Sequence, residues 1–370
     1  MLPGYKRRLE SIAAINTANA TAICDYIAAL QIEVRPSDHY RRGIIDVLAM
    51  LAKRAGTTSF KDLTRDDVIT FLQSFTKTDE EDPLHKWKGT YELFRMQLNR
   101  FFKWLYNPHL GPTARPKPAV MNNIPKLKRK EISIYKPSDL WTTQDDLLFL
   151  KYCPVKRDKC YHAISRDLSA RPVEILKLKI RDLSFKMVGQ QQYAEVTINS
   201  GKSKSRTIPL INSLPYLKDY LSNEHPVPGN PNSPLIASTG KSLGRHITTK
   251  RLHRIYNIYK RVTFPRLLQS PKVVPEDKPL IEQLLKKPWN PYIRRHSALT
   301  EKSMILKENV LRQHAGWTQN SQMQLKYIHY FGNESSQDIL EAYGLVDHGV
   351  QFDQLQPKIC PNCNEGNKEC

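Results

Sequence analysis

The chain has 370 residues, of which 57 are basic and 36 acidic, so its formal net charge at pH 7 is +21. Hydrophobic residues make up 40% of it, which is enough for packed cores and excludes a disordered basic tail as the whole protein. No window approaches a membrane-spanning apolar run, and the first residues do not form a secretory signal. We therefore expect a cytoplasmic protein of two or three domains, and the charge favours nucleic acid over a membrane as its partner.

The first part of the chain, residues 1–106, has the apolar periodicity of helices. Apolar residues recur at helical spacing between 12 and 30, between 44 and 51, and between 91 and 105. Thr64 and Asp67 approximate a capping box before another apolar run. These patterns predict a small all-α domain.

Residues 107–137 contain several prolines and show no periodicity. Such a composition predicts an extended linker between domains. Its basic run contains Lys126, Lys128, Arg129 and Lys130. These side chains suit a phosphate backbone, and a solvated charge run is an equally weighted interpretation.

A second domain is predicted at 138–345, mainly helical and with one small antiparallel sheet. Thr142 is a suitable helix cap, and helical patterns cover 157–183. Residues 193–198 and 206–210 alternate as strands, joined by the lysine-bearing turn 199–205. Residues 346–370 form a C-terminal tail.

The sequence has no glycine-rich phosphate loop and no convincing carboxylate pair for two-metal chemistry. Phosphate chemistry would then depend on positive side chains. Arg171 precedes Pro172 at a predicted helix start, where free backbone N–H groups also favour an anion, although a surface pair with Glu174 would explain it equally simply. Arg294, Arg295 and His296 form a second candidate cluster.

The order of these motifs is more informative than any one of them. Arg-x-x-Glu at 171–174, a lysine-bearing hairpin, Arg-His-Ser at 295–297, Ala-Gly-Trp at 315–317 and then Tyr327 follow one another. This order resembles the catalytic domain of the tyrosine recombinase (phage integrase) family, and the sequences at 314–317 and 327–329 resemble those of its archaeal branch. The resemblance covers about 138–345, and the N-terminal helices are more loosely similar to the family's SAM-like core-binding domain.

The resemblance implies a role for each matching residue. Arg171 and Arg295 would clamp one phosphodiester, and Trp317 would donate an indole N–H to a phosphate oxygen. Lys202 would protonate the leaving 5′ oxygen, and Tyr327 would attack phosphorus to give a 3′-phosphotyrosine. Neither ATP nor a metal would be required. Glu174 and His296 are candidate supporting residues, and Lys204 is a candidate DNA contact.

Two positions leave alternatives open. Tyr292 stands where the family usually has a histidine, so proton transfer would shift toward Lys202 or His296. If Arg294 is aligned with the family's arginine in place of Arg295, the histidine position is again not filled by a histidine. Tyr330 is an alternative nucleophile. Tyr327 lies 32 residues after Arg295, which suits the spacing usual in the family, so the resemblance favours Tyr327.

The cysteines near the end of the chain form an incomplete metal motif. Cys360 and Cys363 are spaced as half of a zinc knuckle, and Cys370 is a third candidate ligand. A fourth ligand is missing, so a structural zinc and an empty remnant carry equal weight.

These observations together predict a site-specific integrase of an archaeal mobile element, associated with the nucleoid. The family implies a homo-tetramer on duplex attachment sites, a Holliday junction and an accessory directionality factor. The alternatives are an Xer-type dimer resolvase, a type IB topoisomerase and a recombinase-derived DNA-binding regulator.

Overall fold

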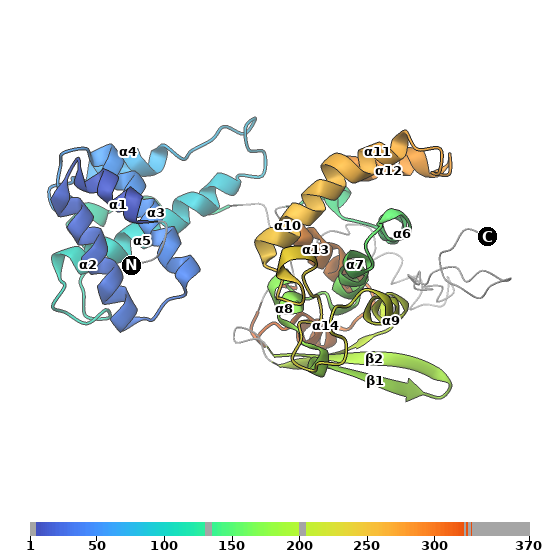
Figure 1. The fold of residues 1–370 in the computed structure, drawn as a ribbon. Helices are drawn as coiled ribbons and strands as arrows, with labels where there is room; N and C mark the ends of the chain where they lie inside the picture. Colours follow the sequence, from blue (N-terminus) through green and yellow to red (C-terminus); the bar gives the residue numbers. More distant parts are fainter. Residues whose placement is uncertain (1–4, 130–134, 200–204, 322, 325–326, 328–370) are drawn as a thin grey trace, which may run out of the picture. The chain divides into compact units, whose positions relative to one another are not determined.

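The computed structural model describes residues 5–129, 135–199, 205–321, 323–324 and 327 (Figure 1). The chain divides into two compact units, Met1–Ile134 and Tyr135–Cys370. Within the described residues, no helix combines the length and the apolar character that a membrane crossing requires.

The first unit is entirely helical in its described part. Its helices are α1 (Lys6–Ala13), α2 (Thr17–Glu33), α3 (Asp38–Ala55), α4 (Arg65–Gln73), α5 (Lys86–Tyr106) and the 3₁₀ turn η1 (Ala119–Met121). Thr64 and Asp67 form the predicted capping box at the start of α4. α5 supplies Leu98, Phe101 and Phe102 to the core, because residues three and four apart share one helix face.

The segment after α5, predicted as an extended linker, packs several of its side chains onto the first unit. Val120, Met121 and Ile124 are buried in that unit's core. Arg115 is buried and forms an ion pair with Glu33. The prolines keep most of the segment out of regular helix, but these three apolar side chains belong to the core.

The second unit surrounds helix α7 and carries a small sheet. Its helices are η2 (Pro137–Asp139), α6 (Thr143–Tyr152), α7 (Lys156–Leu168), α8 (Pro172–Lys177), η3 (Ile180–Asp182), α9 (Leu214–Asn223), η4 (Gly240–Ser242), α10 (Thr249–Ile258), the π-helical η5 (Tyr259–Thr263), α11 (Phe264–Leu268), α12 (Asp277–Lys286), α13 (Pro291–Ser303) and α14 (Glu308–Ala315). α7 packs against α6, α8, α9, α13 and β3. Thr142 caps α6 as predicted.

The sheet consists of β1 (Leu183–Val188), β2 (Gln191–Ile198) and β3 (Arg206–Leu210), antiparallel in the order β1-β2-β3. Val196 pairs with Ile208, so the buried faces of β2 and β3 coincide. The mainly helical fold with a small antiparallel sheet is confirmed. The strand at 183–188 was not predicted, although Leu183, Phe185 and Met187 alternate with polar residues in the sequence.

Candidate active site

Arg171 stands at the start of α8, as the sequence predicts. It is the N-cap residue, Pro172 is the first helical residue, and the Glu174 side chain turns back toward it. Glu174 accepts from the backbone N–H of Arg171 at 3.0 Å and from its guanidinium Nη1 at 3.0 Å. The Glu174 side chain is 3% exposed and that of Arg171 is 34% exposed. Glu174 therefore fixes the base of an arginine that still reaches solvent.

Arg206, the first residue of β3, is a member of this cluster that the sequence did not reveal. It is buried, its Nη2 donates to Glu174 at 3.0 Å, and its Nε donates to the carbonyl of His314 at 2.9 Å. Burial alone would raise the pKa of Glu174. The backbone N–H of Arg171 and the charge of Arg206 outweigh that effect and lower the pKa to about 2. Glu174 is thus a carboxylate at neutral pH.

Arg295 lies on α13 and joins the ends of two other helices. Its Nη1 donates to the carbonyl of Ser169 at 2.7 Å, and its Nη2 donates to that of Ala315 at 3.0 Å. Ser169 ends α7 with a left-handed backbone, φ 45°, which points its carbonyl out of the helix. Burial lowers the pKa of Arg295, and the nearby charge of Arg171 lowers it further. A pair of guanidinium groups whose charges act on each other would suit an anion.

Trp317 and Tyr327 stack beside this anion site. Their ring centroids are 5.5 Å apart with 20° between the planes, and the two side chains are 7% and 2% exposed. Gly316, at φ 69°, ends α14 and turns the chain toward Trp317. The Trp317 indole N–H is buried and donates to no residue that the structure describes. An electrostatic contribution from the Tyr327 phenol acts on the pKa of Arg295 in the opposite direction to that of Arg171.

His296 lies among three tyrosine rings. Its ring centroid is 4.8 Å from that of Tyr135, 5.4 Å from that of Tyr292 and 5.6 Å from that of Tyr327. Tyr292, at the position where a histidine is usual, is 37% exposed and contacts Tyr327 only through this imidazole in the ring contacts described. The imidazole is therefore a titratable ring in contact with the candidate nucleophile.

Arg294, the alternative to Arg295, faces a different part of the unit. It is 1% exposed and its Nη1 and Nη2 lie 2.5 and 2.6 Å from the Asp146 carboxylate. Asp146 also accepts from Arg166 at 2.6 Å and contacts His162 Nε2 at 3.0 Å. Burial would raise the pKa of Asp146, but Arg294 and its other partners lower it well below its usual range. This buried cluster was not predicted from the sequence.

Several predicted site residues lie outside the described residues. They are Lys130, Lys202, Lys204, Tyr330, Cys360, Cys363 and Cys370. Lys126, Lys128 and Arg129 belong to the first unit, where Lys126 and Lys128 are exposed. Among the residues that are described, no three His, Cys, Asp or Glu side chains gather as metal ligands would.

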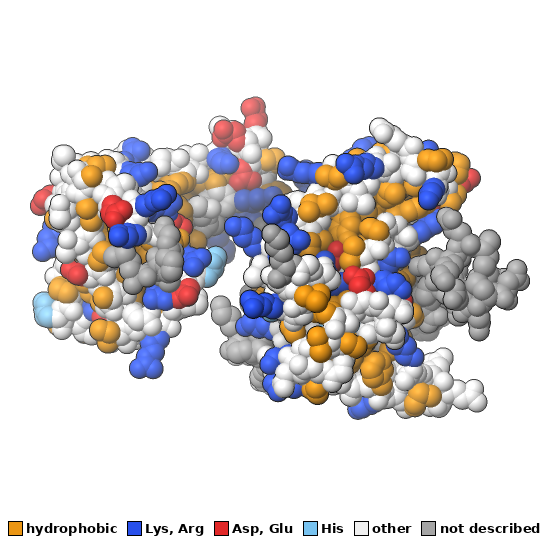
Figure 2. Space-filling view, viewed as in Figure 1, with side chains coloured by type: hydrophobic (Ala, Val, Ile, Leu, Met, Phe, Trp, Pro, Cys, Tyr) orange, Lys and Arg blue, Asp and Glu red, His pale blue; other side chains and the backbone are white. Residues whose placement is uncertain are grey.

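The basic surface is broader than the sequence motifs suggested. Lys and Arg side chains gather over α10 and the helical segment after it in Figure 2. Lys250, Arg254 and Arg261 are exposed there. They recur at roughly helical spacing, which was a signal available in the sequence.

Comparison with solved structures identifies the fold. No protein-family model and no curated protein matches the sequence. The fold matches that of a lambda integrase dimer bound to a COC′ core site, with a TM-score of 0.55, 11% identity, and 90% of this chain and 78% of that chain covered. It also matches the XerH site-specific recombinase bound to difH substrate, with a TM-score of 0.52, 16% identity, and 83% and 79% covered.

A third likeness is to the Tn1549 transposon integrase in complex with transposon right end DNA, with a TM-score of 0.52 and 12% identity. It covers 87% of this chain and 99% of that one. The chain therefore has the fold of the tyrosine recombinases. At these identities the likeness concerns the fold, and the chemistry has to be argued from the side chains.

Proposed function

We propose that this chain is a site-specific DNA recombinase that cuts and rejoins duplex DNA through Tyr327. The observation that carries the proposal is the grouping of Tyr327 with Trp317, His296 and Arg295, next to Arg171, within a tyrosine recombinase fold. A buried phenol next to two guanidinium groups suits attack on a phosphodiester, because the cations stabilise the charge that develops on phosphorus.

The proposed reaction gives each residue one task. Arg171 and Arg295 hold the non-bridging oxygens, and Glu174 orients Arg171. The Trp317 indole N–H, buried without a described partner, donates to one of these oxygens in the transition state. This donor gains its partner only when the phosphate is present, which is the condition for catalysis by differential binding.

The covalent step balances with the residues that the chain supplies. The Tyr327 oxygen bonds to phosphorus as its proton passes to His296, the bond from phosphorus to the 5′ oxygen breaks, and Lys202 gives that oxygen a proton. The 3′-phosphotyrosine retains a phosphodiester-like bond, so the reverse attack by a 5′-hydroxyl rejoins the strand without ATP or a metal.

The biological role that we propose is integration and excision of an archaeal mobile element. Four protomers would act on two attachment sites, with an accessory factor setting direction. A lambda integrase tetramer bound to a Holliday junction, with a TM-score of 0.56 and 10% identity, has the same fold. The likeness to XerH supports an Xer-type resolvase as the second candidate. A structural zinc on Cys360, Cys363 and Cys370 is a separate proposal, tested by metal analysis of the purified chain.

A suicide duplex nicked beside the crossover tests the chemistry. The wild-type chain should become covalently attached to it, and Tyr327→Phe should not. Tyr330→Phe is the matched control and should still form the adduct. If Tyr327→Phe reacts, the nucleophile is another residue. If neither the wild type nor the control reacts on a mapped attachment site, the chain is a DNA-binding regulator.

Two further substrates separate the candidate roles. A type IB topoisomerase would relax a supercoiled plasmid that lacks an attachment site, whereas a recombinase would leave it supercoiled. A plasmid carrying two different attachment sites should be recombined by an integrase. A resolvase should act only on a pair of identical sites in a dimer.

A further inference from the structure

Arg206 is buried at the base of the hairpin formed by β2 and β3. It is the first residue of β3 and pairs with Ile198, the last residue of β2. Lys202, the proposed acid, belongs to the turn between these two residues in the sequence. The Arg206 side chain is only 2% exposed, which excludes direct contact with DNA. Arg206 can therefore act on a reaction only through the residues that it holds.

The guanidinium of Arg206 connects the end of α14 to the carboxylate that holds Arg171. Its Nε donates to the His314 carbonyl at 2.9 Å, and its Nη2 donates to Glu174 Oε2 at 3.0 Å. The same Oε2 accepts from the backbone N–H of Arg171, and Glu174 Oε1 accepts from the Arg171 Nη1, each at 3.0 Å. Arg206 and Arg171 thus share one carboxylate, so the position of one guanidinium constrains the other.

The end of α14 also holds Arg295, the second arginine of the proposed phosphate site. Arg295 donates to the carbonyl of Ala315, the residue after His314, at 3.0 Å. Successive carbonyls at the end of this helix therefore accept from Arg206 and from Arg295. These carbonyls carry the partial negative charge of a helix C-terminus, which suits two cations. Through Arg206, the side chain of Arg171 is tied to the same short segment as that of Arg295.

Stability alone does not account for an arginine at this position. The Nη1 of Arg206 is buried and donates to no residue that the structure describes. Apolar residues that replace a buried ion pair often leave a protein equally stable or more stable. The shape of the side chain is better explained by what it orients. Nε and Nη2 lie along one edge of a planar group and hold a carbonyl and a carboxylate at a fixed angle, which the single nitrogen of a lysine cannot do.

We propose that Arg206 is a positioning residue for strand cleavage, which sets Arg171 relative to Arg295 through Glu174 and the end of α14. The inference rests on the proposed function, because it takes cleavage of a DNA phosphodiester as the reaction. Both guanidinium groups must bind the oxygens of one phosphate, so their separation decides how well they stabilise the transition state. Loss of the link should lower the rate of the covalent step and leave the affinity for DNA unchanged.

The test is the single-turnover rate of adduct formation by the full-length chain on saturating suicide duplex. Arg206→Lys keeps the positive charge beside Glu174 but loses one of the two bonds that fix its direction. We expect the rate constant to fall by about 100-fold, as for other small displacements of a reacting group. Affinity for the intact duplex, measured in the Tyr327→Phe background, should stay within about twofold, because it depends on many other phosphate contacts.

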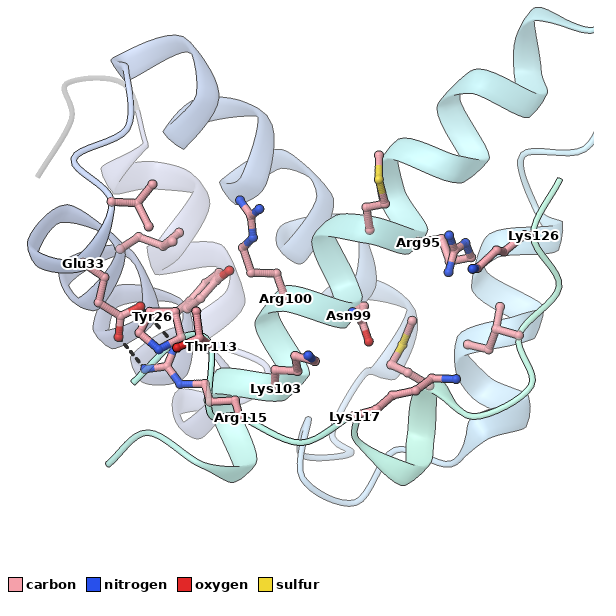
Figure 3. A pocket seen from close by; sticks show the side chains of 16 residues that line it. Tyr26, Glu33, Arg95, Asn99, Arg100, Lys103, Thr113, Arg115, Lys117 and Lys126 are labelled. Atoms are coloured by element: carbon pink, nitrogen blue, oxygen red, sulfur yellow. Dashed lines mark hydrogen bonds and ion pairs between the residues drawn. The ribbon is translucent and has the colours of Figure 1, made fainter. Parts of the chain in front are cut away.

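Arg115→Lys is the matched control. Arg115 is a buried arginine of the first unit that also donates its Nε to a carbonyl, that of Asn107, at 3.1 Å. It also pairs with a glutamate, Glu33, as Figure 3 shows. The two substitutions therefore remove similar bonds, but only Arg206 shares a carboxylate with Arg171. Arg115→Lys should form the adduct with the wild-type rate constant.

A double-mutant cycle separates positioning from folding. In an Arg171→Ala chain there is no second guanidinium to position, so adding Arg206→Lys should slow the residual reaction by less than about threefold. An equal loss in both backgrounds would make Arg206 a general structural residue and overturn the proposal. A wild-type rate constant in Arg206→Lys alone would also overturn it.

One time course distinguishes unfolded from mispositioned protein. Partial unfolding lowers the final amount of adduct, whereas mispositioning lowers the rate constant. If Arg206→Lys does not fold, Arg206→Gln, which keeps one donor group, is measured in its place with the same expected loss.

Failure of this proposal is distinct from failure of the proposed function. If the wild-type chain forms no adduct on a mapped site, strand cleavage is not its activity and the positioning role is lost with it. If the wild type reacts and Arg206→Lys reacts equally fast, cleavage through Tyr327 stands and only the positioning role is lost.

Discussion

Buried histidines should make the second unit lose stability in mild acid. His162 is completely buried, with its Nε2 3.0 Å from Asp146 and its Nδ1 3.0 Å from the Tyr256 hydroxyl. Burial lowers the pKa of His162 to about 4, and the charge of Arg294 adds to the effect. Burial also lowers the pKa of His314 to about 3, with a further contribution from Lys302.

The direction of the effect follows from the pH at which the histidine binds a proton in the unfolded and in the folded chain. In the unfolded chain a histidine binds a proton near pH 6.5, but folded His162 remains neutral until about pH 4. The stabilisation is therefore complete above pH 6.5 and is lost as the pH falls toward 4. When the difference in proton binding between the unfolded and folded states is integrated from pH 7.5 to 5.0, the protonation of His162 lowers the free energy of unfolding by about 2 kcal/mol. His314, which is partly exposed, adds a smaller loss in the same direction.

Urea denaturation at pH 7.5 and at pH 5.0 measures this loss, with tryptophan fluorescence as the signal. Trp141 is a suitable reporter, since its ring centroid is 5.4 Å from that of His162. His162→Gln should remove about 2 kcal/mol of the difference between the two pH values, whatever its stability at either one. The exposed His253→Gln should leave the difference unchanged. An unchanged difference in His162→Gln, or an NMR titration of His162 near pH 6.5, would refute the reasoning.

Three other substitutions test the arginine network. Glu174→Gln leaves buried Arg206 without its counter-charge and should lower the unfolding free energy by about 3 kcal/mol in urea denaturation; an unchanged value would show that the charge is dispensable. Arg295→Lys keeps the charge but loses the planar guanidinium, so adduct formation on the suicide duplex should slow by about 100-fold. A decrease of less than about tenfold would contradict the proposed binding of the phosphate oxygens by Arg295. Asp146→Asn should destabilise the chain by about 3 to 5 kcal/mol, measured by thermal unfolding, and a melting temperature equal to the wild type would contradict the role of its charge.

The sequence predicted the parts of the molecule that depend on local order. The alternation at 193–198 and 206–210 predicted β2 and β3, since side chains on a strand alternate between faces. The resemblance to the family indicated Tyr327 as a candidate nucleophile, and the structure packs that phenol against the rings of Trp317 and His296. Arg171 was predicted at a helix start because proline is tolerated there, and it is the N-cap of α8.

The remaining contacts join residues that are far apart in the chain, so no local pattern reveals them. Arg206 donates to Glu174 across 32 positions, and Arg294 donates to Asp146 across 148. Each partner alone is an ordinary charged residue. The burial of each charged side chain depends on the packing of several elements, which sequence periodicity does not specify. The packed segment after α5 was missed for the same reason, because its core side chains are too irregularly spaced to show a period.

The neighbouring residues Arg294 and Arg295 show why burial alone does not identify a catalytic arginine. Both are almost completely buried, but successive residues on a helix point about 100° apart. Arg294 meets the Asp146 carboxylate, which neutralises it. Arg295 donates to two carbonyl oxygens, which orient the guanidinium without cancelling its charge. Only the second arrangement would leave a positive field for the phosphate that we propose as substrate, and the nearby charge of Arg171 would favour that anion further.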